Sequence, residues 1–280
     1  MIGDKTIARA RLLRELHEGS VLVLPNAWDA ASAALVARAG ARAVATTSGG
    51  VAWALGRADG EGLTRDETVA AVARIAAAVD VPVTADVESG YGETPEDVAA
   101  TIRAVLEAGA VGVNIEDARP ADVTLRPIEE QALRTVEEQA LRIRAARDAA
   151  IPEFVINVRT DVYLREVGDP ADRFDDVLSR ADGYAKAGAD CLFVPGLLNL
   201  ETLSRLTDAS PLPVNVMTGP GGPTIAELAA TGVRRISVGT ALAQAAYAVA
   251  DRAARELLTT GTYTSLEPNI SYPDLNALFT

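Results

Sequence analysis

The chain has 280 residues, of which 49% are hydrophobic and 23% are charged, the balance of a globular protein with a sizeable core. Acidic residues outnumber Lys and Arg by 39 to 26, for a formal net charge of −13 at pH 7. Because such a surface repels phosphate backbones and anionic membranes, and because no Lys/Arg run is present, we expect neither nucleic-acid nor membrane binding.

Signals for secretion and redox chemistry are absent from the sequence. The N-terminal segment Met1–Glu15 mixes charged and apolar residues and has no continuous apolar region, so no signal peptide is predicted. The single cysteine, Cys191, excludes an internal disulfide and a cysteine metal cluster, and we interpret it as a core residue. The single histidine, His17, is expected on the surface of the first helix. We therefore predict a cytoplasmic protein without histidine catalysis.

Eight short apolar runs alternate along the chain with longer segments of helical spacing. Each run is nearly continuous in apolar character, which is typical of a parallel strand buried on both faces. The runs are Val21–Pro25, Ala43–Thr47, Val83–Asp86, Val111–Glu116, Phe154–Thr160, Cys191–Pro195, Val214–Met217 and Arg235–Val238.

Helix boundaries between these runs are marked by capping residues. Thr64 or Asp66 is expected to cap one helix, and Thr94 precedes Pro95 at the first position of another. A repeated helix–Gly–strand junction is typical of βα units, and eight strands favour a closed (β/α)8 barrel, a TIM-type α/β fold. A doubly wound open sheet is the alternative. The junction glycines are Gly40, Gly109, Gly188 and Gly232.

Two segments depart from the βα repeat. Glu129–Arg134 and Glu137–Arg142 carry the same hexapeptide, EEQALR, which we interpret as a duplication that lengthens one helix. From about residue 240 the chain continues into a helical extension, with a long Ala-rich helix at Leu242–Leu258 that exceeds what a barrel needs. We expect residues 1–280 to form a single domain whose C-terminal helix packs on another subunit.

Polar residues gather at the expected carboxyl ends of the strands, where (β/α)8 barrels place their chemistry. Asp86 and Glu88 are two residues apart and share one face of a strand, and Glu116 ends the next strand. Oxygen ligands without His or Cys favour Mg²⁺ or Mn²⁺ over Zn²⁺. Carboxylates in such positions also cap helices or pair with an arginine such as Arg159, so spacing by itself leaves both interpretations open.

Five motifs in matching order resemble the isocitrate lyase/phosphoenolpyruvate mutase superfamily, over about residues 20 to 240. This resemblance implies a Mg²⁺-dependent barrel that acts on small 2-oxo or 2-hydroxy carboxylates and makes or breaks C–C or C–P bonds. The motifs are NAWDAASA (Asn26–Ala33), TTSGG (Thr46–Gly50), TADVESGYG (Thr84–Gly92), GVNIEDA (Gly112–Ala118) and NVRTD (Asn157–Asp161).

The resemblance also implies roles for individual residues. Asp86 matches a direct Mg²⁺ ligand, whereas Glu88 and Glu116 match acidic residues that hold the ion largely through water. Ser48 and Gly49 match a loop that receives the substrate carboxylate. Arg159 matches an arginine that pairs with substrate, and Asp59 matches an aspartate on a gating segment. The predicted substrate-binding set is Ser48, Gly49, Gly50, Asp86, Arg159 and Asn215, and the catalytic candidates are Arg159, Asp59 and Tyr91.

The sequence departs from the family pattern where named members carry their acid and base. Isocitrate lyases have a KKCGH-type loop with a catalytic Cys, but Asp117–Val123 contains neither Cys nor His. Phosphonate enzymes have a lid Lys and a His after the sixth strand, whereas here that strand ends at Phe193–Gly196. Thr46 also stands where many members have an aromatic residue.

Three functional hypotheses remain open. The first is a lyase or decarboxylase that cleaves a C–C bond in a small di- or tricarboxylate through an enolate, with Tyr91, Glu129 or Glu130 as candidate proton donors. The second is C–P chemistry on a phosphonopyruvate-like acid, and the third is a non-catalytic 2-oxo-acid binding protein. The resemblance further implies a homo-oligomer, a tetramer or dimer, that exchanges a C-terminal helix between subunits.

Overall fold

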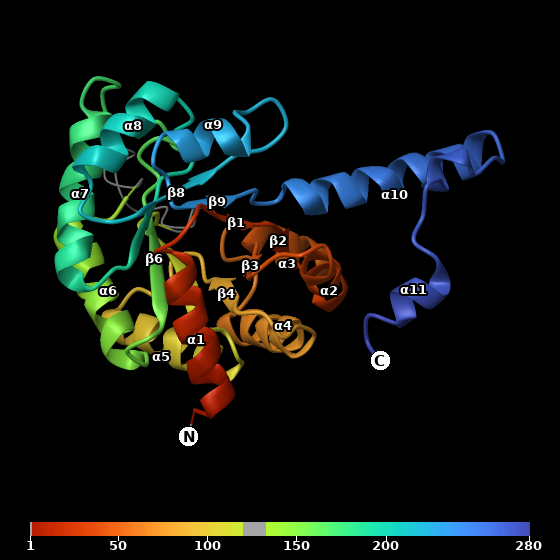
Figure 1. The fold of residues 1–280 in the computed structure, drawn as a ribbon, viewed down its shortest axis with the longest axis horizontal. Coiled ribbons are helices and arrows are strands. Elements are labelled where there is room, and N and C mark those ends of the chain that lie inside the picture. Colours follow the sequence, from red (N-terminus) through yellow and green to blue (C-terminus); the bar gives the residue numbers. More distant parts are fainter. Residues whose placement is uncertain (1, 120–132) are drawn as a thin grey trace.

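The computed structural model describes residues 2–119 and 133–280, in which strands and helices alternate along most of the chain (Figure 1). The strands are β1 (Leu22–Leu24), β2 (Asn26–Ala27), β3 (Val44–Thr46), β4 (Val83–Asp86), β5 (Gly112–Glu116), β6 (Val155–Arg159), β7 (Cys191–Phe193), β8 (Val214–Met217) and β9 (Arg235–Ser237). The helices are α1 (Asp4–Leu16), α2 (Ala30–Arg38), α3 (Ser48–Ala54), α4 (Arg65–Ala77), α5 (Pro95–Glu107), α6 (Val136–Ala149), α7 (Arg173–Ala187), α8 (Leu200–Ala209), α9 (Ile225–Ala230), α10 (Ala241–Thr259) and α11 (Tyr272–Asn276), with a 3-10 turn at Thr264–Leu266.

The strands of the described residues form one parallel sheet in the order β1-β9-β8-β7-β6-β5-β4-β3-β2. The two edge strands, β1 and β2, are consecutive in the chain and are separated by Pro25. Proline has no N–H to give to the ladder, so β1 ends before Pro25 and a second short strand, β2, begins just beyond the predicted run Val21–Pro25. The two edges thus belong to one stretch of chain, and the predicted (β/α)8 barrel is confirmed against the open sheet.

Asn26 joins the two sides of the barrel at this interruption. Its Oδ1 accepts hydrogen bonds from the backbone N–H groups of Val238 (3.0 Å) and Gly239 (2.9 Å), beyond β9. Its Nδ2 donates to the carbonyl oxygen of Thr46 in β3, at 2.9 Å. A buried amide with both ends paired replaces the ladder that Pro25 interrupts.

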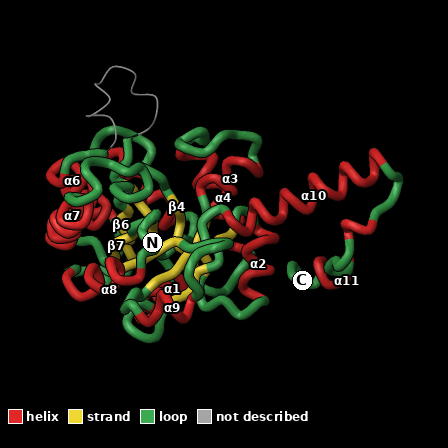
Figure 2. Tube along the Cα trace, turned by 90° about the horizontal axis from the view of Figure 1, so that it is seen from above, coloured by secondary structure: helices red, strands yellow, loops and turns green. Residues whose placement is uncertain are grey.

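Helices surround the strands, as the view from above shows (Figure 2). The predicted helix starts are confirmed, because Thr64 and Thr94 each accept a hydrogen bond from the backbone of the third helical residue. The four junction glycines have positive φ between 90° and 103°, as their capping role requires. Cys191 is fully buried in β7, in agreement with its predicted core role.

The prediction that the EEQALR duplication lengthens one helix is wrong for the described part of the chain. Helix α6 begins at Val136, after an N-cap at Thr135 whose side chain accepts from the N–H of Glu138. Arg134, the last residue of the first copy, lies before this cap and is buried. The capping box that Thr135 forms with Glu138 therefore starts a new helix between the two copies. Residues 129–132 lie outside the described residues.

Helix α10 extends away from the barrel (Figure 1). Its first half is held to the barrel by Tyr247, whose ring centroid lies 6.5 Å from that of Trp28 and 6.4 Å from that of Trp53. Its second half exposes apolar side chains, among them Leu257 and Leu258. Across the described ranges, no helix combines the length and apolar character needed to span a bilayer.

The loop after β4 is held in place by Arg142 of α6, a side chain that is only 2% exposed. Its Nη2 donates to the carbonyl oxygens of Ser89 (2.6 Å) and Gly92 (2.8 Å), and its Nη1 donates to that of Glu93 (2.7 Å). A rigid guanidinium fork suits this task because it serves several acceptors at once. The neighbouring helix thereby fixes the position of the loop.

We expect Arg142→Met to lower the free energy of unfolding by at least about 2 kcal/mol, because three loop carbonyls, at buried and partly buried positions, lose a charged donor. Urea unfolding would measure this loss, and hydrogen exchange would show faster exchange of the loop amides. Arg144→Met, at an exposed position on the same helix, is the matched control and should change stability by less than about 0.5 kcal/mol. Equal effects of the two substitutions would contradict the anchoring role.

His17 is buried, so the prediction that it lies on the surface is wrong. Helix α1 packs Leu13 and Leu16 against the beginnings of several strands. His17, which caps the C-terminal end of this helix, is buried as well. The His17 Nδ1 lies 2.7 Å from the Leu13 carbonyl oxygen. Burial, reinforced by the positive charge of Arg235, lowers the pKa of His17 from 6.5 to about 4.

This buried histidine should make the protein acid-sensitive. The unfolded chain binds a proton near pH 6.5 and the folded protein only near pH 4, so stability falls as the pH drops through this window. We expect His17→Gln to remove roughly 2–3 kcal/mol of the loss between pH 7.5 and pH 4.5. Urea unfolding of both proteins at the two pH values tests this, and parallel pH dependences would refute it.

Candidate active site

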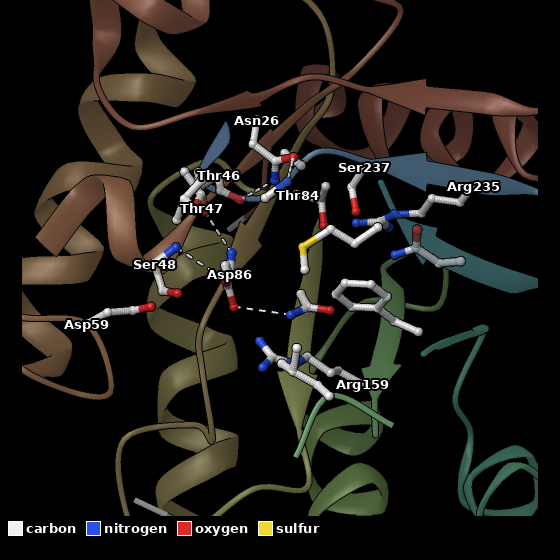
Figure 3. Close-up of a pocket in the computed structure, with 18 residues that line it drawn as sticks. Asn26, Thr46, Thr47, Ser48, Asp59, Thr84, Asp86, Arg159, Arg235 and Ser237 are labelled. Atoms are coloured by element: carbon white, nitrogen blue, oxygen red, sulfur yellow. Dashed lines mark hydrogen bonds between the residues drawn. The ribbon is translucent and has the colours of Figure 1, made fainter. Parts of the chain in front are cut away.

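A cavity of about 190 Å³ opens among the carboxyl ends of the strands (Figure 3). Two carboxylates, two arginines and several hydroxyl and amide groups lie on its wall, together with apolar side chains. It is lined by Asn26, Ala45, Thr46, Thr47, Ser48, Asp59, Thr84, Asp86, Asn114, Arg159, Leu164, Phe193, Asn215, Met217, Arg235, Ser237, Gly239 and Thr240.

Asp86, the last residue of β4, is oriented in this cavity by hydrogen bonds. Its Oδ2 accepts from the Ser48 backbone N–H (3.2 Å) and its Oδ1 accepts from Asn114 Nδ2 (3.1 Å). Its own N–H donates to Thr46 Oγ1 at 2.7 Å. These contacts come from the two strands beside β4, namely β3 with the segment that follows it and β5, and they fix the carboxylate in one orientation (Figure 3).

Glu88 lies beside Asp86 but is not on the cavity wall. Its carboxylate accepts from Tyr91 OH (3.1 Å) and from the backbone N–H of Glu61. Glu88 and Tyr91 both have positive φ, 49° and 56°, an uncommon conformation for residues other than glycine. Burial, and then the negative charge of Asp86, raises the pKa of Glu88 to about 7. Several acidic groups therefore lie close together around Asp86.

Arg159, at the end of β6, is held between two acidic side chains. Its Nη1 lies 2.8 Å from Glu116 Oε2, and its Nε and Nη2 lie 2.5 and 2.9 Å from the two oxygens of Asp161. Burial would lower the pKa of Arg159, but the charges of Glu116 and Asp161 outweigh it and raise this pKa. For the carboxyl of Glu116 the effect of burial is the opposite: it raises the pKa, and the positive charge of Arg159 opposes that rise.

Asp117 supports Arg159 from behind. It is fully buried outside the cavity, where its Oδ2 accepts from Arg180 Nη1 (2.9 Å) and Tyr184 OH (2.8 Å). Its Oδ1 accepts from the backbone N–H of Asp161 at 3.1 Å. Asp117 thus positions the residue that orients Arg159, and it is not available to a ligand.

The oxygen donors around Asp86 can meet the needs of a divalent cation. Within the described ranges, no three His, Cys, Asp or Glu side chains are grouped closely enough to form a metal shell by themselves. Mg²⁺ commonly binds one or two carboxylates and retains several waters. Asp86 could hold such an ion directly, and Glu88 and Glu116 could act on its waters. The acidic groups around Asp86 and their oxygen donors fit a Mg²⁺ ion held in this way.

The structure brings together only part of the predicted site. Ser48, Asp59, Asp86, Arg159 and Asn215 line one cavity. The other predicted residues, Gly49, Gly50, Glu88, Glu116 and Tyr91, are not on its wall. Glu129 and Glu130, named as candidate proton donors, lie outside the described residues.

The two glycines serve close packing behind the cavity wall. A Cβ on Gly49 would lie 2.9 Å from Thr240 Cγ2 and 3.0 Å from Asp59 Oδ2. A Cβ on Gly50 would lie 2.8 Å from Trp28 Cβ. Only glycine allows α3 to approach the neighbouring segments this closely.

Sequence reasoning missed Arg235, which reaches the cavity from β9. The available signal was a charged residue within an apolar run predicted to be buried on both faces, since such a charge needs a partner inside the barrel. Asn114, which orients Asp86, was likewise not singled out.

Comparison with known proteins identifies the family of this chain. The phosphoenolpyruvate phosphomutase family matches residues 13–258. A solved structure of a Burkholderia cenocepacia J2315 protein, described only as a lyase/mutase, superposes with a TM-score of 0.88 at 39% identity, covering 99% of this chain and 98% of that one. The 2-methylisocitrate lyase of Escherichia coli (strain K12) is 34% identical over 74% of this chain and 67% of its own length.

A further solved structure, oxaloacetate acetylhydrolase in complex with the product oxalate, has a TM-score of 0.83 at 25% identity and covers 96% of this chain and 93% of that one. The family match spans far more than half of the chain and confirms the resemblance seen in the motifs. The chain belongs to the phosphoenolpyruvate phosphomutase family, within the isocitrate lyase/phosphoenolpyruvate mutase superfamily of carbon–carbon lyases and mutases.

Proposed function

We propose that this protein is a Mg²⁺-dependent lyase or decarboxylase that cleaves a C–C bond in a small 2-oxo or 2-hydroxy carboxylate through an enolate. The observation that carries the proposal is the pairing of an oriented carboxylate, Asp86, with an oriented guanidinium, Arg159, on the wall of one cavity. A 2-oxo carboxylate needs a positive group for its carboxylate and a cation beside its oxo oxygen, and Arg159 and an ion held by Asp86 would supply them.

The chain's own residues bind and orient the substrate in this proposal. Arg159 attracts the substrate carboxylate. Its ion pairs with Glu116 and Asp161 keep the guanidinium in place before the substrate binds. The Ser48 N–H and the Asn114 amide keep Asp86 turned toward the cavity. Bound Mg²⁺ would supply a Lewis acid that stabilises negative charge developing on the 2-oxo group.

The names of the relatives include both kinds of chemistry. One is a 2-methylisocitrate lyase and another an oxaloacetate acetylhydrolase solved with oxalate, whereas the family itself is described as phosphoenolpyruvate phosphomutase. The residues of this chain support the choice of C–C cleavage. Decarboxylation of an oxaloacetate-like acid requires mainly an electron sink, so it tolerates the loss of the catalytic Cys. For C–P chemistry, the cavity wall formed by the described residues carries Phe193 on β7 and no histidine.

The test is release of pyruvate or glyoxylate from a panel of oxaloacetate, substituted malates, isocitrates and phosphonopyruvate, with Mg²⁺ or EDTA. We expect Asp86→Ala to reduce turnover at least about a hundredfold, because it removes the proposed direct ligand. Asp148→Ala, at an exposed position on α6, is the control and should retain activity. Turnover of phosphonopyruvate alone would favour C–P chemistry, and Mg²⁺-dependent binding without turnover would indicate a binding protein.

We also propose that the protein is a homo-oligomer, a dimer or tetramer, assembled through α10. The support is the row of exposed apolar side chains on a helix that leaves the barrel, with Leu258 87% exposed. Leu258→Glu should shift the mass measured by light scattering toward the monomer. Leu141→Glu, at an exposed apolar position on the barrel helix α6, should leave the mass unchanged. A monomeric wild-type protein would refute the proposal.

A further inference from the structure

Arg235 lies deep in the cavity, on a strand that no predicted site residue occupies. It is the first residue of β9, its side chain is 2% exposed, and it lines the same cavity as Asp86 and Arg159. Figure 3 shows the two arginines and Asp86 reaching this space from different strands. Arg235 precedes Ser237 by two residues, so it lies one layer below the strand end.

The guanidinium of Arg235 forms no direct ion pair in the described part of the chain, and the negative charge of Asp86 acts on it from a greater distance. Its Nε and Nη1 are buried without a hydrogen-bond partner. Burial lowers the pKa of Arg235 to about 10, so the group remains charged at neutral pH. A buried charge without a counterion is strongly unfavourable, and proteins retain such groups where a ligand neutralises them.

Arg235 shares this layer with other unsatisfied polar groups. Asn215, its register partner on β8, leaves both Nδ2 and Oδ1 unpaired, and Thr84 on β4 leaves its Oγ1 unpaired. All three residues are buried and line the cavity. Several convergent donors around an uncompensated cation make a floor suited to an anion rather than to a cation or an apolar group.

Arg159 differs from Arg235 in having direct ion pairs within the protein. Arg159 forms direct ion pairs with Glu116 and Asp161, whereas Arg235 forms none within the described residues and is influenced only at longer range by Asp86. The floor of the cavity therefore contains a cation without a direct anionic contact. A substrate with one carboxylate near Asp86 and Arg159 would leave this floor unsatisfied.

We propose that Arg235, together with Asn215, binds a second carboxylate of the substrate, so that the ligand of this cavity is a dicarboxylate. The inference rests on the proposed function, because it places the 2-oxo or 2-hydroxy acid end of the same molecule beside Asp86. Arg235 then selects dicarboxylates over monocarboxylates of equal length.

The experiment compares malate with 2-hydroxybutyrate by isothermal titration in the presence of Mg²⁺. These acids have the same four-carbon chain and differ in whether its far end is a carboxylate or a methyl group. We expect the wild-type protein to bind malate at least about tenfold more tightly, and Arg235→Gln to abolish this preference while its affinity for 2-hydroxybutyrate stays within about threefold.

Arg234→Gln is the matched control, because the neighbouring side chain is exposed and donates only to the Gly19 carbonyl oxygen. It should keep the full preference for malate. If Arg235→Gln does not fold, as judged by circular dichroism, Arg235→Lys retains the charge without the planar fork and should show a reduced preference.

Two results would overturn the inference and separate it from the proposed function. Mg²⁺-dependent binding of both acids with equal affinity, or a preference that survives in Arg235→Gln, removes the role of Arg235 and leaves the proposed function standing. Binding of neither acid by the wild-type protein, with or without Mg²⁺, removes both.

Discussion

The clamp that Glu116 and Asp161 form on Arg159 is the interaction on which the rest of the site depends. The three residues lie at the adjoining ends of β5 and β6 and just beyond, where register places Glu116 directly opposite Arg159. A guanidinium with this many buried contacts cannot rotate away without leaving charged partners unpaired. The cost of moving it makes Arg159 a fixed anchor, and Asp117 reinforces the anchor through the backbone of Asp161.

The remaining charges of the cavity are not balanced in the same way. Asp86 and Glu88 place two acidic groups on one side, where burial and then the charge of Asp86 raise the pKa of Glu88, and Arg235 carries a positive charge at the floor without a direct ion pair. Without a bound ligand, these charges lie in or beside the cavity without direct partners of opposite sign among the described residues. A divalent cation beside Asp86 and a dicarboxylate reaching Arg235, the two ligands proposed above, would supply such partners on both sides.

Residues outside the cavity do much of the positioning. Arg142 binds the carbonyls of the loop after β4, and Tyr91 in that loop donates to Glu88. Asn26 closes the barrel between β9 and β3, next to the cavity. The site is therefore rigid where the barrel ladder continues and depends on side-chain hydrogen bonds where Pro25 and the strand ends interrupt it.

The sequence by itself determined the features that depend on local pattern. Apolar runs, capping threonines and junction glycines predicted the βα repeat, and the strand ends placed Ser48, Asp86 and Arg159 at one rim. Only the tertiary structure decided which of the candidate side chains reach the cavity. Glu88, Glu116 and Tyr91 turned to partners beside it, while Arg235 reached it from below. The burial of His17 and the close approach at Gly49 likewise arise from segments distant in the chain. Local periodicity assigns a residue to a strand or helix, but contacts between distant segments set the direction and partners of its side chain.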